Sequence, residues 1–168
     1  MDDAAVVVAF YVLAIITLVS AFMVSMVRDL VHAVLFLILS FIGVAGLYIT
    51  LSADFVAVAQ ILIYAGAISV LMLFAILLTP RSGRDNEPVS YAAPVSAIAG
   101  LIGAVILFVA LSTEWQEVDR EVSGSTARAI GNALLDPYVL PFEVASILLV
   151  IAMVGAIILV KPANEEES

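Results

Sequence analysis

The sequence contains no cysteine and only one histidine, His32. Without cysteine the chain cannot form a disulfide, ligate an iron–sulfur cluster or build a thiolate metal site. A single histidine also excludes a haem held by two histidines of this chain. We therefore expect the chain to hold no cofactor of its own and to carry no electrons.

Charge is also scarce, because only 12% of the 168 residues are charged while 64% are hydrophobic. Soluble domains carry about 25% charged residues, so this composition indicates a membrane protein surrounded by the lipid bilayer and other membrane proteins. The net charge of -9 comes mainly from acids at the termini and in loops. We interpret these acids as solvated ends rather than as a binding surface, and no nucleic-acid partner is expected.

Five long apolar runs organise the chain, over residues 4–26, 33–51, 55–78, 95–111 and 142–160. Each run has roughly the 17 to 25 residues that cross a bilayer as a helix. The sequence therefore predicts an all-α integral membrane bundle of five transmembrane helices, forming a single membrane domain over residues 1–168. A polar loop over 112–141 precedes the last helix, and its stretch 125–135 is weakly amphipathic, as in a helix that lies on a membrane surface.

Basic residues set the orientation that we expect. A five-helix arrangement puts Arg28, Arg81, Arg84 and Lys161 on one side, and Arg120 and Arg128 in the longer loop opposite. Basic residues in short loops mark the cytoplasmic side of a membrane. We therefore expect the N-terminus outside and the C-terminus in the cytoplasm of a cell with an inner (plasma) membrane.

The third apolar run carries residues that a plain membrane anchor would not need. Gln60 and Tyr64 lie one turn apart on one helix face, and the step Ala-Gly66-Ala67 follows. The two polar side chains either hydrogen-bond to neighbouring helices without any transport role or order water in an apolar layer. Gly66 is either a close-packing residue or the site of a π-bulge, which is frequent at functional sites. Such a bulge turns every later side chain by about 100°, which could open and close a water path.

Acidic residues are nearly absent at membrane depth, although ion pumps normally build a charged relay there. The chain is therefore expected to be one subunit of a larger complex. Glu143 has two interpretations. If the last helix begins at Pro141, Glu143 lies in its first turn, where the helix dipole stabilises an acid. If residues 138–142 are also submerged, Glu143 is an intramembrane proton site. Asp54 is expected to be the N-cap of the third helix.

Four segments of the sequence together match a family signature. The third run contributes Asp54-Phe55, Gln60-Ile-Leu-Ile-Tyr64-Ala-Gly66-Ala67-Ile68-Ser69-Val70-Leu71 and Phe74. The other segments are His32-Ala33, Gly46-Leu-Tyr48, and Leu135-Asp136-Pro137-Tyr138-Val139-Leu140 with Glu143-Val-Ala-Ser146. The chain thereby resembles the J subunit of proton-pumping NADH:quinone oxidoreductase, respiratory complex I. The similarity covers most of the chain, except residues 79–94 and the tail after Lys161.

That resemblance implies a membrane-arm subunit of five helices near the quinone end of the arm. NADH, FMN, iron–sulfur clusters and quinone are then expected with partner subunits, among them the other membrane-arm subunits of complex I. In this family the third helix is thought to change between α and π form, which couples quinone reduction to a water path for protons. Carried over to this chain, the switch centres on Tyr64, Gly66, Ala67 and Val70. Gln60 stands where some relatives have Glu, and it can order water but cannot titrate.

Two other functions remain open. A related chain occurs in multisubunit cation/proton antiporters and membrane-bound hydrogenases, where the same helix would serve transport without quinone. Alternatively, the chain is a purely structural subunit that holds neighbouring helices together and switches nothing. The proteins that co-purify with the chain separate the first alternative from complex I, and a coupling defect in a third-helix variant excludes the second.

Overall fold

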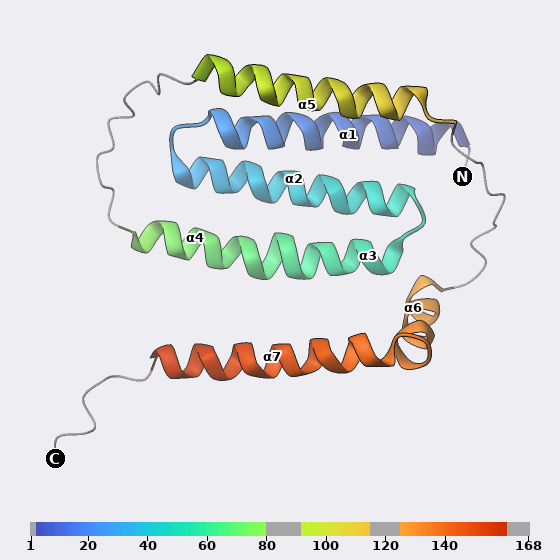
Figure 1. Ribbon diagram of the computed structural model, residues 1–168, viewed down its shortest axis with the longest axis vertical. Helices are drawn as coiled ribbons and strands as arrows, with labels where there is room; N and C mark the ends of the chain where they lie inside the picture. The colour runs from blue at the N-terminus through green and yellow to red at the C-terminus, as the bar shows by residue number, and fades with distance from the viewer. Residues whose placement is uncertain (1–2, 80–91, 115–124, 161–168) are drawn as a thin grey trace. The chain divides into compact units, whose positions relative to one another are not determined.

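The computed structural model describes residues 3–79, 92–114 and 125–160, and within these ranges it consists of helices and short turns with no strand. The elements along the chain are α1 (Asp3–Met26), α2 (Leu30–Thr50), α3 (Asp54–Ala59), η1 (Gln60–Ile68), α4 (Ser69–Leu78), α5 (Ala92–Ser112), α6 (Thr126–Leu135) and α7 (Val139–Val160) (Figure 1). The prediction of an all-α chain is confirmed for these ranges.

The chain divides into two compact units, Met1–Leu73 with Val122–Ser168, and Phe74–Glu121. In the first unit α1 packs along α2, and α2 packs against α3 and η1. In the same unit the short helix α6 contacts both α3 and α7. The second unit contains the end of α4 and the whole of α5. That the chain forms one membrane domain stays a prediction.

Four helices of the described chain are long and apolar enough to cross a membrane: Ala4–Met26, Leu30–Thr50, Asp54–Leu78 and Val139–Val160. The fifth predicted span, 95–111, falls in α5, where the stretch Ala97–Ser112 is apolar but shorter. The predicted polar loop 112–141 is not a loop throughout. It contains α6, at the place of the amphipathic stretch 125–135, and the first residues of α7. A membrane protein with several spanning helices is therefore confirmed, and the fifth span stays a prediction.

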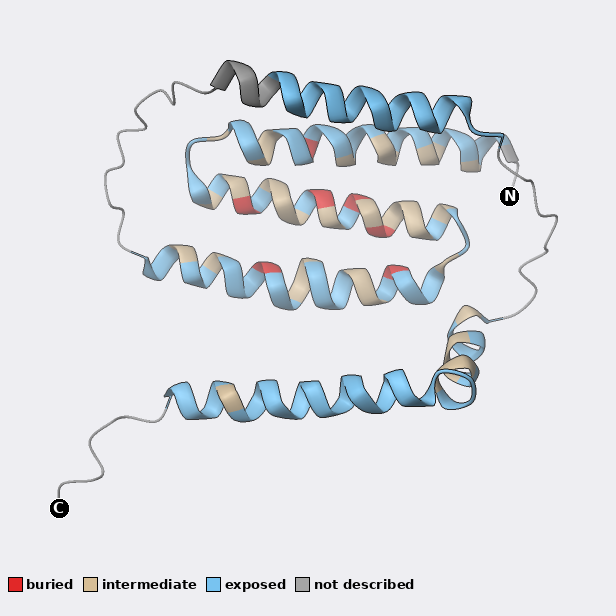
Figure 2. Cartoon of the chain, in the orientation of Figure 1, coloured by how far each residue is buried: buried red, intermediate tan, exposed pale blue. Residues whose placement is uncertain are grey.

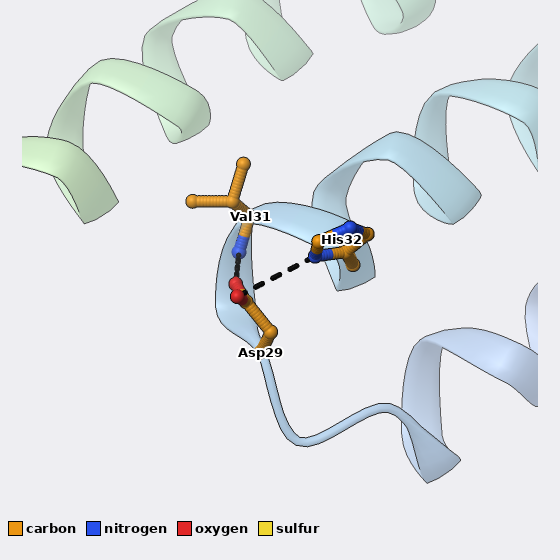
Figure 3. Close-up of polar contacts among 3 residues, drawn as sticks. All are labelled: Asp29, Val31 and His32. Carbon is orange, nitrogen blue, oxygen red and sulfur yellow. Dashed lines mark hydrogen bonds and ion pairs between the residues drawn. The ribbon is translucent and has the colours of Figure 1, made fainter.

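The second helix begins at Leu30 rather than at residue 33, because Asp29 caps it. A carboxylate oxygen of Asp29 accepts a hydrogen bond from the Val31 N–H at 2.9 Å, and its other oxygen lies 3.4 Å from Nδ1 of His32 (Figure 3). The side-chain oxygen thereby satisfies a backbone donor that the helix itself leaves free. The Val31 N–H, helped by His32, holds the pKa of the Asp29 carboxyl below its ordinary value.

A tight turn connects α2 to the third helix. Ser52 adopts a left-handed backbone conformation with φ 58°. The Ala53 N–H donates to the Tyr48 carbonyl at 2.9 Å, and the Ser52 N–H donates to the Ile49 carbonyl at 3.0 Å. These two bonds form the Schellman motif that closes the end of a helix. Ala53 is the N-cap of the next helix, so the prediction for Asp54 is wrong by one residue; Asp54 is the first helical residue.

Small residues on α2 allow a close contact with α1. The buried residues of α2 are Val34, Ser40, Gly43 and Ala45, drawn red in Figure 2. A Cβ atom built on Gly43 would collide with Oγ1 of Thr17 in α1 and would lie 3.4 Å from the Thr17 Cα. The Ser40 hydroxyl donates to the Thr17 carbonyl at 3.5 Å. The missing side chain of Gly43 therefore lets the two backbones approach, as is common between membrane helices.

Large apolar side chains are mostly exposed among the described residues, and Figure 2 shows residues 97–112 of α5 and nearly all of α7 in the colour of exposed residues. Examples are Leu71, Leu149 and Leu159, which are 68%, 71% and 88% exposed. Such an apolar surface is unstable in water, so lipid or partner subunits must cover it. The chain therefore has the surface expected of a subunit in a membrane complex.

Candidate functional site

The third membrane helix, Asp54–Leu78, is not α-helical throughout. Its first part, α3, and its last part, α4, are α-helical, whereas the nine residues between them, Gln60–Ile68, form the π-helix η1. Runs of π-helix are rare and frequently lie at functional sites. Of the two interpretations of Gly66, the structure has the π conformation around this residue, and the role of that conformation stays a prediction.

Ser69 closes the π segment at its C-terminal end. Its N–H donates to the carbonyl of Tyr64, five residues earlier, which is the π pattern, and also to the carbonyl of Gly66. The Ser69 hydroxyl donates to the same Tyr64 carbonyl at 2.7 Å, and Ser69 is 0% exposed. Ser69 was not among the predicted site residues. The sequence does mark it, as the only serine or threonine of the apolar run 55–78, two residues after the Ala-Gly-Ala step.

The π segment also brings two small residues onto one face of the third helix. Ala57 in α3 is 1% exposed and Ser69 in α4 is 0% exposed. At 100° per residue, an unbroken α-helix would place these positions about 120° apart around its axis. Counting the π segment as one inserted residue reduces the difference to about 20°. In Figure 2 both red positions of this helix lie on the edge toward α2. The π form therefore aligns the two buried residues of this helix.

Gly66 fits the π segment because it has no side chain. A Cβ atom built there would lie 3.2 Å from the carbonyl oxygen of Ile61, five residues earlier. That distance is tighter than an ordinary van der Waals contact, so a side chain at this position would press on the carbonyl that the π pattern brings near it. In an α-helix the neighbouring carbonyl along the hydrogen-bond direction is the one four residues earlier. We therefore expect a side chain at residue 66 to disfavour the π form, in which the Ile61 carbonyl lies close to it.

Tyr64 connects the π segment to α2. Its ring lies edge-on to the ring of Phe41, with centroids 5.6 Å apart and an angle of 66° between the planes. Aromatic rings favour this arrangement. Tyr64 is still 46% exposed, so part of the ring is left to contact lipid or a partner.

The other predicted site residues do not all lie in the π segment. Gln60 is the first residue of η1 and is half-buried, whereas Ala67 in η1 and Val70 in α4 are exposed. Glu143 lies on a different helix, α7. One element, η1, therefore contains Gln60, Tyr64, Gly66 and Ala67. Val70 follows in α4, and Glu143 belongs to a different helix.

Glu143 does not lie in the first turn of the last helix, so the interpretation that depended on a start at Pro141 is wrong. The helix begins at Val139, and its first turn contains no acid. Pro141 sits inside that turn, where its missing N–H costs no hydrogen bond. Glu143 is exposed within an otherwise uncharged helix, and its backbone carbonyl accepts the Ser146 hydroxyl at 2.7 Å. Its role as a proton site stays a prediction.

Metal ligands are not assembled in the part of the chain that the structure describes. No three His, Cys, Asp or Glu side chains lie together there in a way that could hold a metal ion. The features that can do chemistry are the hydrogen bonds of η1, the polar groups of Gln60 and Tyr64, and the carboxylate of Glu143.

Comparison with known proteins identifies the family. Residues 20–159 match the family model of NADH-ubiquinone/plastoquinone oxidoreductase chain 6. The chain is 40% identical over 157 residues to F(420)H(2) dehydrogenase subunit J of Methanosarcina mazei, a match that covers 90% of this chain and 89% of the relative. It is 39% identical over 163 residues to NAD(P)H-quinone oxidoreductase chain 6 of Synechocystis sp., covering 92% of this chain and 80% of the relative.

A further relative is NADH-quinone oxidoreductase subunit J of Rhodobacter capsulatus, 36% identical over 163 residues, with 90% of this chain and 79% of the relative covered. The family match includes the whole of η1 and also Glu143. The resemblance seen in the sequence is thereby confirmed. The chain belongs to the family of NADH-quinone oxidoreductase subunit J, or chain 6, a membrane subunit of an oxidoreductase complex.

Proposed function

We propose that this chain is a membrane-arm subunit of a proton-translocating NADH:quinone oxidoreductase, in which its third helix couples quinone reduction to proton movement. The observation that carries the proposal is η1, a π segment in the middle of a membrane-spanning helix. The names of two relatives, both subunits of quinone oxidoreductases, support the same complex.

The proposed switch exchanges π hydrogen bonds for α hydrogen bonds between residues 60 and 69. In the π form the Ser69 N–H bonds to the Tyr64 carbonyl, and in the α form it would bond to the carbonyl of Ala65, four residues earlier. The exchange turns the residues after the segment by about 100° relative to those before it. Val70, which follows the segment directly, would then lie in the water path in one form and away from it in the other.

Polar groups beside the switch give water places to bind. Gln60 and Tyr64 can each donate and accept hydrogen bonds, so they can order water without changing charge. Titration is left to carboxylates, which in this proposal are Glu143 and groups of the partner subunits. Iron–sulfur clusters would lie with partner subunits, because this chain has no cysteine to ligate them. NADH, FMN and the quinone site are proposed to lie with partner subunits as well.

Purification of the complex in mild detergent tests this function. We expect the chain to co-purify with an iron–sulfur flavoprotein that reduces quinone, and vesicles reconstituted with the complex should pump protons during quinone reduction. NADH is the expected donor, and F(420)H(2) should be assayed beside it because one relative belongs to an F(420)H(2) dehydrogenase. A stable isolated monomer, or a complex of antiporter or hydrogenase subunits without quinone reductase activity, would contradict the proposal.

The proposed topology has five spans in an inner (plasma) membrane, with the N-terminus outside and the C-terminus in the cytoplasm. It predicts that a cysteine at position 82 (Ser82→Cys) reacts with a membrane-impermeant maleimide only from the cytoplasm. A cysteine at position 123 (Ser123→Cys) should react only from outside. Both positions lie outside the described residues. The chain has no cysteine of its own, so it gives no background label. Labelling from the opposite sides would overturn the orientation.

A further inference from the structure

The first turn of the third helix lacks a cap from its own chain segment. Ala53 is the N-cap residue, and the Ala57 N–H donates to its carbonyl at 3.0 Å. Its methyl side chain cannot accept a hydrogen bond from the free N–H groups of the first turn. A Ser, Thr, Asp or Asn at the N-cap would normally accept from the second or third residue of the helix, which here are Phe55 and Val56.

Thr126 supplies that missing cap from a distant part of the sequence. Its Oγ1 accepts a hydrogen bond from the Phe55 N–H at 3.3 Å, across 71 residues of sequence. Thr126 is the first residue of α6, and α6 packs against α3 within the same compact unit. The Phe55 N–H, which donates to Thr126, is one of the groups that would normally donate to an N-cap side chain of the same segment.

The N-terminal end of the third helix is therefore held at two points. The Schellman turn, with the Ala53 N–H bonded to the Tyr48 carbonyl, ties it to α2. Thr126 ties it to α6, which itself packs against α7. Ala57, buried at 1% exposure, fixes the rotational position of the same segment.

Beyond the π segment the helix stays in this unit only as far as Leu73. The boundary between the two compact units falls inside α4, after Leu73. A change between π and α form must rotate one side of η1 relative to the other by about 100°. Rotation of the N-terminal side would break the Schellman turn and the Phe55–Thr126 bond and would expose Ala57. Rotation of the C-terminal side would expose Ser69, but the Ser69 bonds that it breaks are ones that the change between π and α form breaks in any case.

We propose that Thr126 is a positioning residue that holds the N-terminal side of the third helix in place. The change between π and α form then rotates α4. This inference rests on the proposed function, because it specifies which side of the switch moves. It assigns α6 a role in coupling: a surface helix that fixes the stationary end.

Spin labels on the two sides of η1 test this inference in the whole purified complex. Val58 in α3 is 55% exposed and Leu71 in α4 is 68% exposed, so Val58→Cys and Leu71→Cys each place a nitroxide without displacing a buried side chain. The parent complex, labelled in the same way, supplies the background from cysteines of partner subunits. Spectra are recorded at rest and during quinone reduction, with Thr126 unchanged, with Thr126→Val and with Thr126→Ser.

With Thr126 unchanged, we expect turnover to alter the spectrum of the label at residue 71 and to leave that at residue 58 unaltered. Thr126→Val, which removes only the hydroxyl, should make the label at residue 58 respond as well and should lower the protons pumped per quinone about twofold to fivefold, as for loss of one helix cap. Thr126→Ser keeps the hydroxyl and should behave as the parent. A merely structural Thr126 would change yield without changing which label responds.

Two results would overturn the inference while leaving the switch intact: a response at residue 58 with Thr126 unchanged, or no response there in the Thr126→Val complex while residue 71 still responds. If the complex pumps protons while neither label responds, the proposed switch itself is contradicted, and this inference with it. The Thr126→Ser control separates loss of the hydroxyl from disturbance of α6.

Discussion

Gly66→Val is expected to leave the complex assembled and to lower proton pumping and coupled quinone reduction about tenfold, given that overpacking costs about 1 to 3 kcal/mol and 1.4 kcal/mol is a factor of ten. The reason is the 3.2 Å approach between a Cβ at residue 66 and the Ile61 carbonyl oxygen in the π form. A branched side chain enlarges that contact and locks the helix in the α form. The measurement is proton pumping in reconstituted vesicles, with a subunit inventory of the same sample.

Three variants control for other effects at this site. Gly66→Ala adds only the Cβ, so it enlarges the contact with the Ile61 carbonyl less than valine does and should give a smaller loss. Tyr64→Phe keeps the ring against Phe41 and should lower proton pumping less than Gly66→Val does. At Gly103 in α5, apart from the backbone of its own helix, no atom of the described chain lies within 4 Å of a new Cβ. Gly103→Val should therefore leave pumping unchanged. Normal pumping in Gly66→Val would make Gly66 a packing residue, and disassembly would favour a purely structural subunit.

Gly43→Ala, unlike Gly66→Val, should impair assembly of the complex and leave the coupling of proton pumping to quinone reduction intact. The new methyl group meets Oγ1 of Thr17 and lies 3.3 Å from its Cβ, so α1 must move away from α2. Overpacking of this kind costs about 1 to 3 kcal/mol. We expect a lower melting temperature and a lower yield of the complex, while the complexes that do assemble pump the normal number of protons per quinone.

A second substitution can relieve the Gly43→Ala defect. Thr17→Ala removes the oxygen that the new methyl group meets, together with the Thr17 methyl group. The lost hydroxyl donates to its own helix, to the Leu13 carbonyl at 2.8 Å. The double variant should therefore recover part of the lost stability, a coupling that a double-mutant cycle measures. Additive effects of the two substitutions would show that the α1–α2 contact at these residues is not as close as the structure has it.

Much of the fold could be predicted because the apolar runs are long. The helices α1, α2, α5, α7 and the third helix begin and end within three residues of the predicted limits. The start of α2 was missed because Asp29 acts through one hydrogen bond to Val31, which hydropathy does not register. The start of α7 was missed because Pro141 was taken as a boundary, whereas proline is tolerated inside a first turn.

The candidate site could be predicted only in part. Glycine between two alanines indicated a place where the third helix could depart from the α form, and η1 includes this place. Ser69 and Thr126 were missed because their bonds depend on the folded backbone: the first joins residues five apart only in a π-helix, and the second spans 71 residues. Apolar surfaces that face lipid and those that face a partner have the same composition, so the partner contacts of α7 cannot be read from its sequence.

The central claim is that the third helix exchanges π for α form while the complex works. The most direct measurement is structure determination of the complete complex at rest and during steady quinone reduction. We predict that residues 60–68 are π-helical in one state, with the Ser69 N–H on the Tyr64 carbonyl, and α-helical in the other, with that N–H on the carbonyl of Ala65. A π-helix with the same hydrogen bonds in both states, in a preparation that pumps protons at full rate, would contradict the account.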